Sequence, residues 1–396
     1  MAEIFPLEIS PRSVQQSTTA SSTVATPWFV WSGVVAVSSI TFGLYWDISW
    51  HMTIGRDTFW TPAHLAVHFG GILAAITCTY LIFSTTFGRD RAAREQSVQV
   101  WGFRGPLGAF FTAWGGAMML TSAPFDNWWH ASFGLDVQIL SPPHFVLGLG
   151  INGVVLGSTL LVISRMNGTQ GAARARLVRL LLYLAGLQLV LHMMLIYEYS
   201  DAGLMHSTTF YRVLTIGVPV ILITYGRVSG YRWGSTTIAS VYTAFMLVTT
   251  WVFPLFPASP KLGPVYTNVT HMLPLGFPML LLAPAFLLDL TSLKIAGQNR
   301  WTQAAILGTV YLVGLVAAHW PFANVLISSH ARNWFFGENN IPYFVPPSVY
   351  RLFYEFRRVD PTPAAFLTGM SVAWATAMVS SRVGIAIGDA MKRLRR

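Results

Sequence analysis

Charge and cysteine are both scarce in this chain. Only 10% of its 396 residues are Asp, Glu, Lys or Arg, whereas an average soluble domain carries roughly 25%. The one cysteine, Cys78, lies in the apolar run "ILAAITCTYLIF". A single cysteine excludes an intramolecular disulfide, and it also excludes zinc or iron–sulfur sites that need several thiolates. The low charge argues against a soluble fold.

Apolar residues are correspondingly abundant. The chain is 53% hydrophobic and its mean hydropathy is +0.52. About twenty apolar residues cross a bilayer as a helix, the simplest way to satisfy backbone hydrogen bonds in lipid. The sequence therefore predicts an all-α, polytopic integral membrane helix bundle with about ten transmembrane helices and both termini cytoplasmic. The expected spans are 27–46, 62–86, 105–123, 142–164, 178–198, 210–226, 236–254, 269–290, 302–320 and 363–384.

The basic residues gather in alternate connections between these spans, and they account for much of the net charge of +10. Because cytoplasmic loops are enriched in Lys and Arg, this alternation predicts the cytoplasmic side. The charge is thus a topology signal, and no nucleic-acid partner is expected. By the same alternation all ten histidines fall in the outer half of the spans or in outer connections. The cytoplasmic connections contain Arg89, Arg91, Arg94, Arg104, Arg165, Arg174, Arg176, Arg179, Arg227, Arg232, Lys294 and Arg300.

Two polar stretches on the outer side share one pattern. They are "DISWHMTIGRDTFWTPAH", residues 47–64, and "DNWWHASFGLDVQILSPPH", residues 126–144. Both read D-x2-W-H-x3-G-x-D, then Pro near the next span, then His. The matched pairs are Asp47 and Asp126, Trp50 and Trp129, His51 and His130, Gly55 and Gly134, and Asp57 and Asp136.

This pattern favours a metal site in each stretch. Asp and His four apart lie on one face of a helix, and Pro opens the next helix just before the second His. One carboxylate with two imidazoles is a common ligand set for copper, iron or zinc. The plainer interpretation is interfacial Trp and charge with ordinary helix capping. The repetition favours the metal sites.

The run W-H-x-T-I-x-R-D-T-x2-T-P-x-H within 50–64 resembles the metal-site segment of the C subunit of copper membrane monooxygenases. These are the particulate methane and ammonia monooxygenases, and the resemblance covers roughly residues 30–165. It implies one copper site at Asp47, His51 and His64, and a neighbouring one at Asp126, His130 and His144. The family typically has an amide at the position of Asp126. Its C subunit is also shorter than this chain and works beside two partner subunits.

The chain accordingly divides into four expected parts. Residues 1–26 form a disordered polar tail, and residues 27–165 form the metal-site transmembrane domain. Residues 166–386 add further helices, with an outer lid-like segment near 321–362, and residues 387–396 are a basic cytoplasmic tail. Five more residues are candidates to support the ligands by hydrogen bonds or ion pairs: Arg56, Asp57, His68, Asp136 and Glu198.

The resemblance and the ligand set together predict a membrane-embedded metal-dependent monooxygenase. It would use copper, with iron as the alternative because the same ligands serve both. The enzyme would activate O2 with electrons from a donor such as quinol and hydroxylate a small apolar substrate. The chemistry would take place at the outer face of the cytoplasmic membrane, in the lipid bilayer, with partner subunits or a second copy. The alternative function is membrane metal binding or transport, or an accessory subunit without its own catalysis.

Overall fold

The computed structural model of the chain describes residues 25–55, 58–134, 141–337 and 341–395. Ten long or medium helices dominate the described residues, and their only sheet is one short hairpin of β1 (Val98–Val100) and β2 (Phe103–Gly105). The helices are α1 (Trp28–Thr53), α2 (Pro62–Phe87), α4 (Leu107–Phe133), α5 (Pro142–Asn167), α6 (Gly171–Leu195), α7 (Thr208–Ser229), α8 (Gly234–Val252), α9 (Leu282–Lys294), α10 (Arg300–Ile327) and α11 (Pro363–Met391). Short turns of helix are α3 (Arg91–Glu95), η1 (Tyr197–Tyr199), η2 (Ala202–Leu204), η3 (Phe253–Leu255), η4 (Ser329–Ala331) and η5 (Pro347–Phe353).

Eight helices in the described part of the chain are long and apolar enough to cross a membrane. They are α1, α2, α5, α6, α7, α8, α10 and α11. The prediction of a helical, multi-pass membrane protein is therefore confirmed. Helix α4 has the length of a span, 27 residues, but is not among the eight.

The predicted span at 269–290 is wrong as a single helix. Residues 269–281 contain no helix, and α9 has only 13 residues. At 1.5 Å per residue α9 is about 20 Å long, which is short of a hydrocarbon core of ~30 Å. Pro274 and Pro278 explain the break, because proline has no N–H to donate and clashes with the preceding turn of a helix.

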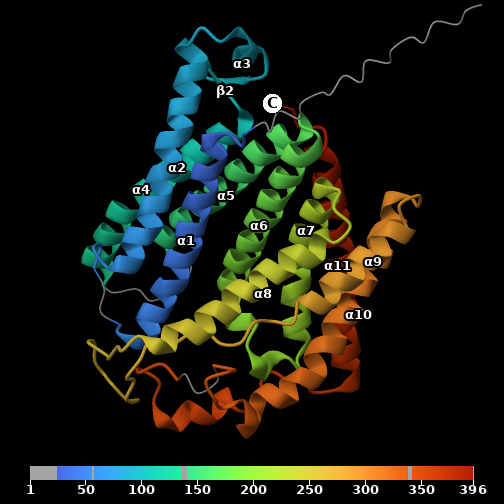
Figure 1. Ribbon diagram of the computed structural model, residues 1–396. Coiled ribbons are helices and arrows are strands. Elements are labelled where there is room, and N and C mark those ends of the chain that lie inside the picture. The colour runs from blue at the N-terminus through green and yellow to red at the C-terminus, as the bar shows by residue number, and fades with distance from the viewer. Residues whose placement is uncertain (1–24, 56–57, 135–140, 338–340, 396) are drawn as a thin grey trace, which may run out of the picture.

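Two groups of helices pack side by side (Figure 1). In one group α1 packs on α2 and α5, while α4 packs on α2 and α5. In the other, α7, α10 and α11 pack together with α8 and α9. Helix α6 joins the groups through contacts with α1, α5, α7 and α8.

The two ends of the bundle differ in character. Helix α2 starts at Pro62, two residues before His64, and ends at Phe87, just before Arg89 and Arg91. Its 26 residues span about 39 Å, so the histidine-rich stretches and the arginine-rich connection lie at opposite ends. At the histidine end, the non-helical residues 256–281 and the segment after α10 cross the helix ends (Figure 1). The expected lid-like segment at 321–362 begins as helix, because α10 continues to Ile327.

Candidate metal centre

Asp47 and His51 lie on the last two turns of α1, four residues apart. This helix runs seven residues beyond the predicted boundary at residue 46 and ends at Thr53. Gly55 follows with a φ of 82°, a left-handed conformation that glycine adopts without the steric cost of a side chain. The helix end therefore places both side chains on one face, as the four-residue spacing predicts.

His64 reaches the same point from the start of α2. Pro62 is the first residue of that helix, where its missing N–H is not needed. The turn before it is closed by two hydrogen bonds: Thr58 N donates to Thr61 Oγ1 at 2.9 Å, and Thr61 N donates to Thr58 O at 2.9 Å. Thr58 O also lies 2.9 Å from His64 Nδ1. A carbonyl only accepts, so Nδ1 carries the proton and Nε2 is directed toward Asp47.

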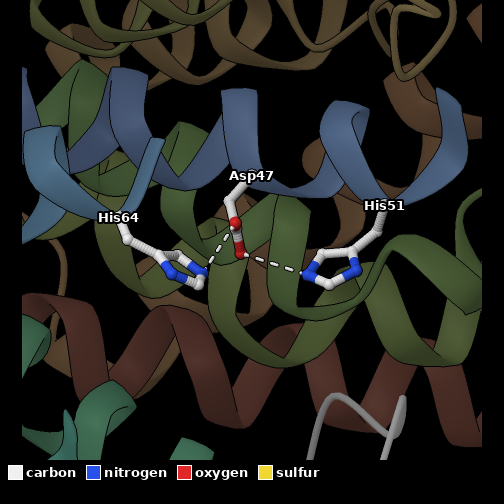
Figure 2. A group of neighbouring side chains, drawn as sticks. All are labelled: Asp47, His51 and His64. Carbon is white, nitrogen blue, oxygen red and sulfur yellow. Dashed lines mark ion pairs between the residues drawn. The ribbon is translucent and has the colours of Figure 1, made fainter. Parts of the chain in front are cut away.

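Asp47 lies between the two imidazoles, as Figure 2 shows. Its Oδ1 lies 3.0 Å from His64 Nε2, and its Oδ2 lies 3.9 Å from His51 Nε2. One ligand atom from each of the three residues lies within 4.8 Å of the others. Asp47 Oδ1 is itself buried and has no hydrogen-bond donor. A buried carboxylate oxygen without a donor is costly, and a cation at this point would satisfy it.

The three side chains differ in their access to the surroundings. Asp47 is 18% exposed, His64 is 25% exposed and His51 is 43% exposed. An ion held by these ligands would be shielded on the Asp47 side and accessible on the His51 side. Three protein ligands leave coordination positions for further molecules. One oxygen and two nitrogen ligands suit copper, iron or zinc, so the set selects a class of metal rather than one element.

The second stretch forms a wider version of the same arrangement. Asp126 and His130 end α4, and His144 is the third residue of α5. Nε2 of His130 lies 3.3 Å from Asp126 Oδ2, and Nε2 of His144 lies 3.6 Å from Asp126 Oδ1. Asp126 Oδ1 is also buried without a donor. Within the described residues, only the first triad brings all three ligand atoms within 4.8 Å of one another.

A backbone carbonyl orients one histidine in each triad. In the first triad it is Thr58 O, which faces His64. In the second it is Gly134 O, which lies 3.2 Å from His130 Nδ1. Gly134 follows α4 with a φ of 86°, so it corresponds to Gly55 in conformation as well as in sequence. Such a contact fixes the ring orientation and makes the other nitrogen a better ligand. Sequence reasoning missed both carbonyls, because any residue type supplies one.

The five supporting candidates have different outcomes. Arg56, Asp57 and Asp136 lie outside the described residues. His68 lies one turn from His64 on α2, and its ring stacks on Phe59 with centroids 5.1 Å apart. Glu198 is exposed on η1, after α6, and no contact of its side chain with either triad is found among the described residues.

Other histidines at this end have structural contacts instead. His319 is fully buried, with Nδ1 2.9 Å from Leu315 O and Nε2 accepting from Leu280 N at 3.0 Å. His206 stacks between Trp320 and Phe356. Their positions explain the outer location of these histidines without a metal.

Comparisons of the chain with protein-family models, curated proteins and solved structures found no match.

Proposed function

We propose that this chain is a copper-dependent membrane monooxygenase whose centre is Asp47, His51 and His64. One observation carries the proposal: Asp47 Oδ1 is buried without a donor, at a point where two imidazole nitrogens lie 3.0 Å and 3.9 Å from its carboxylate. A cation removes this conflict, because all three groups then donate electron pairs to it. The second triad offers a second, wider position of the same kind.

The three residues of the proposed centre have different roles in binding the metal. Asp47 balances the positive charge, and His64 is held in one orientation by Thr58 O. His51, the most exposed ligand, leaves room for a small substrate to arrive beside it. Bound copper would supply the one-electron and O2 chemistry that side chains alone cannot.

The reaction inserts one atom of O2 into a C–H bond of a small apolar molecule, and the other atom leaves as water. Two electrons and two protons complete the balance, and a lipid-soluble quinol is the proposed donor. The arginine-rich connection lies at the opposite end from the triads. By the positive-inside rule, that end faces the cytoplasm, so the proposed centre faces outward from the cytoplasmic membrane.

The first experiment measures copper per protein in purified wild type, His51→Ala, His130→Ala and His330→Ala. His330 is an exposed histidine on η4, outside both triads, and serves as the control. Loss of bound copper is expected in the two triad variants and not in His330→Ala. Wild-type copper content in both triad variants would contradict the site.

The second experiment tests catalysis. Copper-loaded protein in lipid vesicles is supplied with a quinol, ¹⁸O2 and short alkanes, and products are examined by mass spectrometry. An ¹⁸O-labelled alcohol that disappears in Asp47→Ala supports the monooxygenase. Bound copper with neither O2 uptake nor product would instead favour the metal-binding or accessory function.

A further inference from the structure

The last two turns of α1 carry two buried hydroxyl groups on the side opposite Asp47 and His51. Ser49 and Thr53 each follow a ligand, Asp47 and His51, by two residues. Two residues turn a helix by about 200°, so these hydroxyls lie on the side of α1 away from the metal ligands. Both are fully buried, with 0% exposure. Something on that side must therefore bind the hydroxyls.

Both hydroxyls bind the backbone of a single residue, Leu273. Ser49 Oγ donates to Leu273 O at 2.5 Å, and Leu273 N donates to Thr53 Oγ1 at 2.9 Å. Thr53 Oγ1 in turn donates to Ser49 O at 2.7 Å. One turn back along α1, the Tyr45 hydroxyl accepts from Leu275 N at 2.9 Å. Leu273 and Leu275 belong to the buried, non-helical part of the chain before α9.

This segment, residues 272–281, is called the strap below. It has no helical hydrogen bonds of its own, and buried backbone groups need partners. Its far end finds them on other helices: Met279 N donates to Tyr242 of α8, and Leu280 N donates to His319 of α10. The strap is therefore tied to the second helix group at one end and to α1 at the other.

The residues that end α1 are held by further outer segments. Lys261 N donates to Ile54 O at 2.9 Å, and Tyr343 N donates to Met52 O at 3.3 Å. Any side chain at Gly55 would overlap the Tyr343 ring. Three segments of the second half of the chain thus fix the rotation and the end of α1.

The second triad provides a comparison within the molecule. The residues of α4 that correspond to Ser49 and Thr53 are Trp128 and Ser132. Both are exposed, Trp128 at 55%, so no segment among the described residues covers that face of α4 as the strap covers α1. The strapped triad is the one whose three ligand atoms lie within 4.8 Å, and the unstrapped triad is wider.

We infer that Ser49 and Thr53 are positioning residues of the metal centre, which act by locking the rotation of α1 against the strap. The inference rests on the proposed metal-binding function. It assigns a role to the second half of the chain: that half holds the ligand-bearing helix end in place. A rotation of α1 would move Asp47 and His51 together away from His64.

The test compares variants of Ser49 and Thr53 with a matched buried hydroxyl on the same helix. Thr53→Val is nearly isosteric and removes the hydroxyl, whereas Thr53→Ser retains it. Thr41 is also fully buried, and its hydroxyl bonds only to Val37 O of its own helix, so Thr41→Val is the control. Copper affinity is measured by chelator competition and ligand geometry by electron paramagnetic resonance of Cu(II).

Ser49→Ala and Thr53→Val are expected to weaken copper binding at one site by about tenfold, the scale of losing a group that orients ligands, and to alter its resonance spectrum. Thr53→Ser and Thr41→Val should match wild type. If Ser49→Ala does not fold, the Thr53 pair decides. If the wild type binds copper and both Ser49→Ala and Thr53→Val keep its copper affinity and resonance spectrum, this inference is wrong and the proposed function is unaffected. Wild type that binds no copper contradicts the proposed function, and the inference with it.

Discussion

At the scale of single residues, each triad contains a carboxylate with one buried oxygen that receives no hydrogen bond. The two oxygens are Asp47 Oδ1 and Asp126 Oδ1, both buried without a donor. Each of these oxygens faces a histidine Nε2 at 3.0 Å or 3.6 Å. A metal ion at each proposed site would bind these oxygens and so satisfy them.

Replacing Asp47 by Asn is expected to reduce copper affinity more than the roughly 10–100-fold that changes behind the ligands cost. The amide keeps the size of the carboxylate but removes the charge that balances the metal. Chelator competition measures the loss. The control is Asp90→Asn, an exposed carboxylate that caps the short α3 at the other end. Copper affinity within twofold of wild type in Asp47→Asn would contradict the site.

Residue spacing predicted which three residues come together in the first triad but not what orients them. Asp47, His51 and His64 could be found because helix periodicity and a helix-opening proline fix where they lie. The Thr58 carbonyl could not, since a backbone acceptor leaves no mark on residue type. Likewise the hydroxyl residues Thr53 and Ser132 hold matching positions in the two stretches, and the sequence did not show that only Thr53 is buried. That difference depends on a segment more than two hundred residues away.

At the scale of helices, the contact between α4 and α5 determines the width of the second triad. Asp126 and His130 come from α4, and His144 comes from α5. The two helices meet through glycines: a Cβ at Gly115 would lie 2.6 Å from Gly150 O, and one at Gly150 would lie 2.8 Å from Gly115 O. Small residues let membrane helices approach closely, so these positions set the distance across the triad.

Gly150→Ala is therefore expected to separate α4 from α5 and to weaken copper binding at the second triad only. Overpacking of this kind typically costs about 1–3 kcal/mol of stability. Gly148→Ala is the control on the same helix, because a Cβ there meets nothing within 4 Å. A copper titration that resolves two sites measures the effect. Equal second-site affinities in the two variants would show that this contact does not control the triad.

Helix positions were predictable where apolar runs had clear ends, and unpredictable where prolines interrupted them. The spans expected at 62–86 and 142–164 are α2 (Pro62–Phe87) and α5 (Pro142–Asn167), each opened by a proline. The run at 269–290 is also largely apolar, yet it contains the non-helical strap. An apolar composition indicates that a segment is buried. Its backbone conformation depends on which groups bind its N–H groups, such as the hydroxyls of Tyr45 and Tyr242.

At the scale of the whole molecule, ion pairs join three helices at the end opposite the triads. Asp389 of α11 binds Arg227 of α7, with Nε 2.5 Å from Oδ1, and Arg300 of α10, with Nη2 3.0 Å from Oδ2. One carboxylate thus joins three helices and separates two guanidinium groups. Ion pairs thus join helices at this end, whereas backbone hydrogen bonds of the strap join them at the triad end.

Asp389→Asn is expected to lower the stability of the protein without changing its copper affinity. The substitution leaves the partly buried Arg227 guanidinium facing the exposed one of Arg300, and the loss of its charged partner costs roughly 1–3 kcal/mol. Thermal unfolding in detergent and chelator competition measure the two quantities separately. Glu95→Gln is the control at the same end, since the exposed pair of Arg91 and Glu95 should contribute little. Helix α11 packs chiefly on α7 and α10, so a loss of copper affinity in Asp389→Asn would contradict this separation of the two ends.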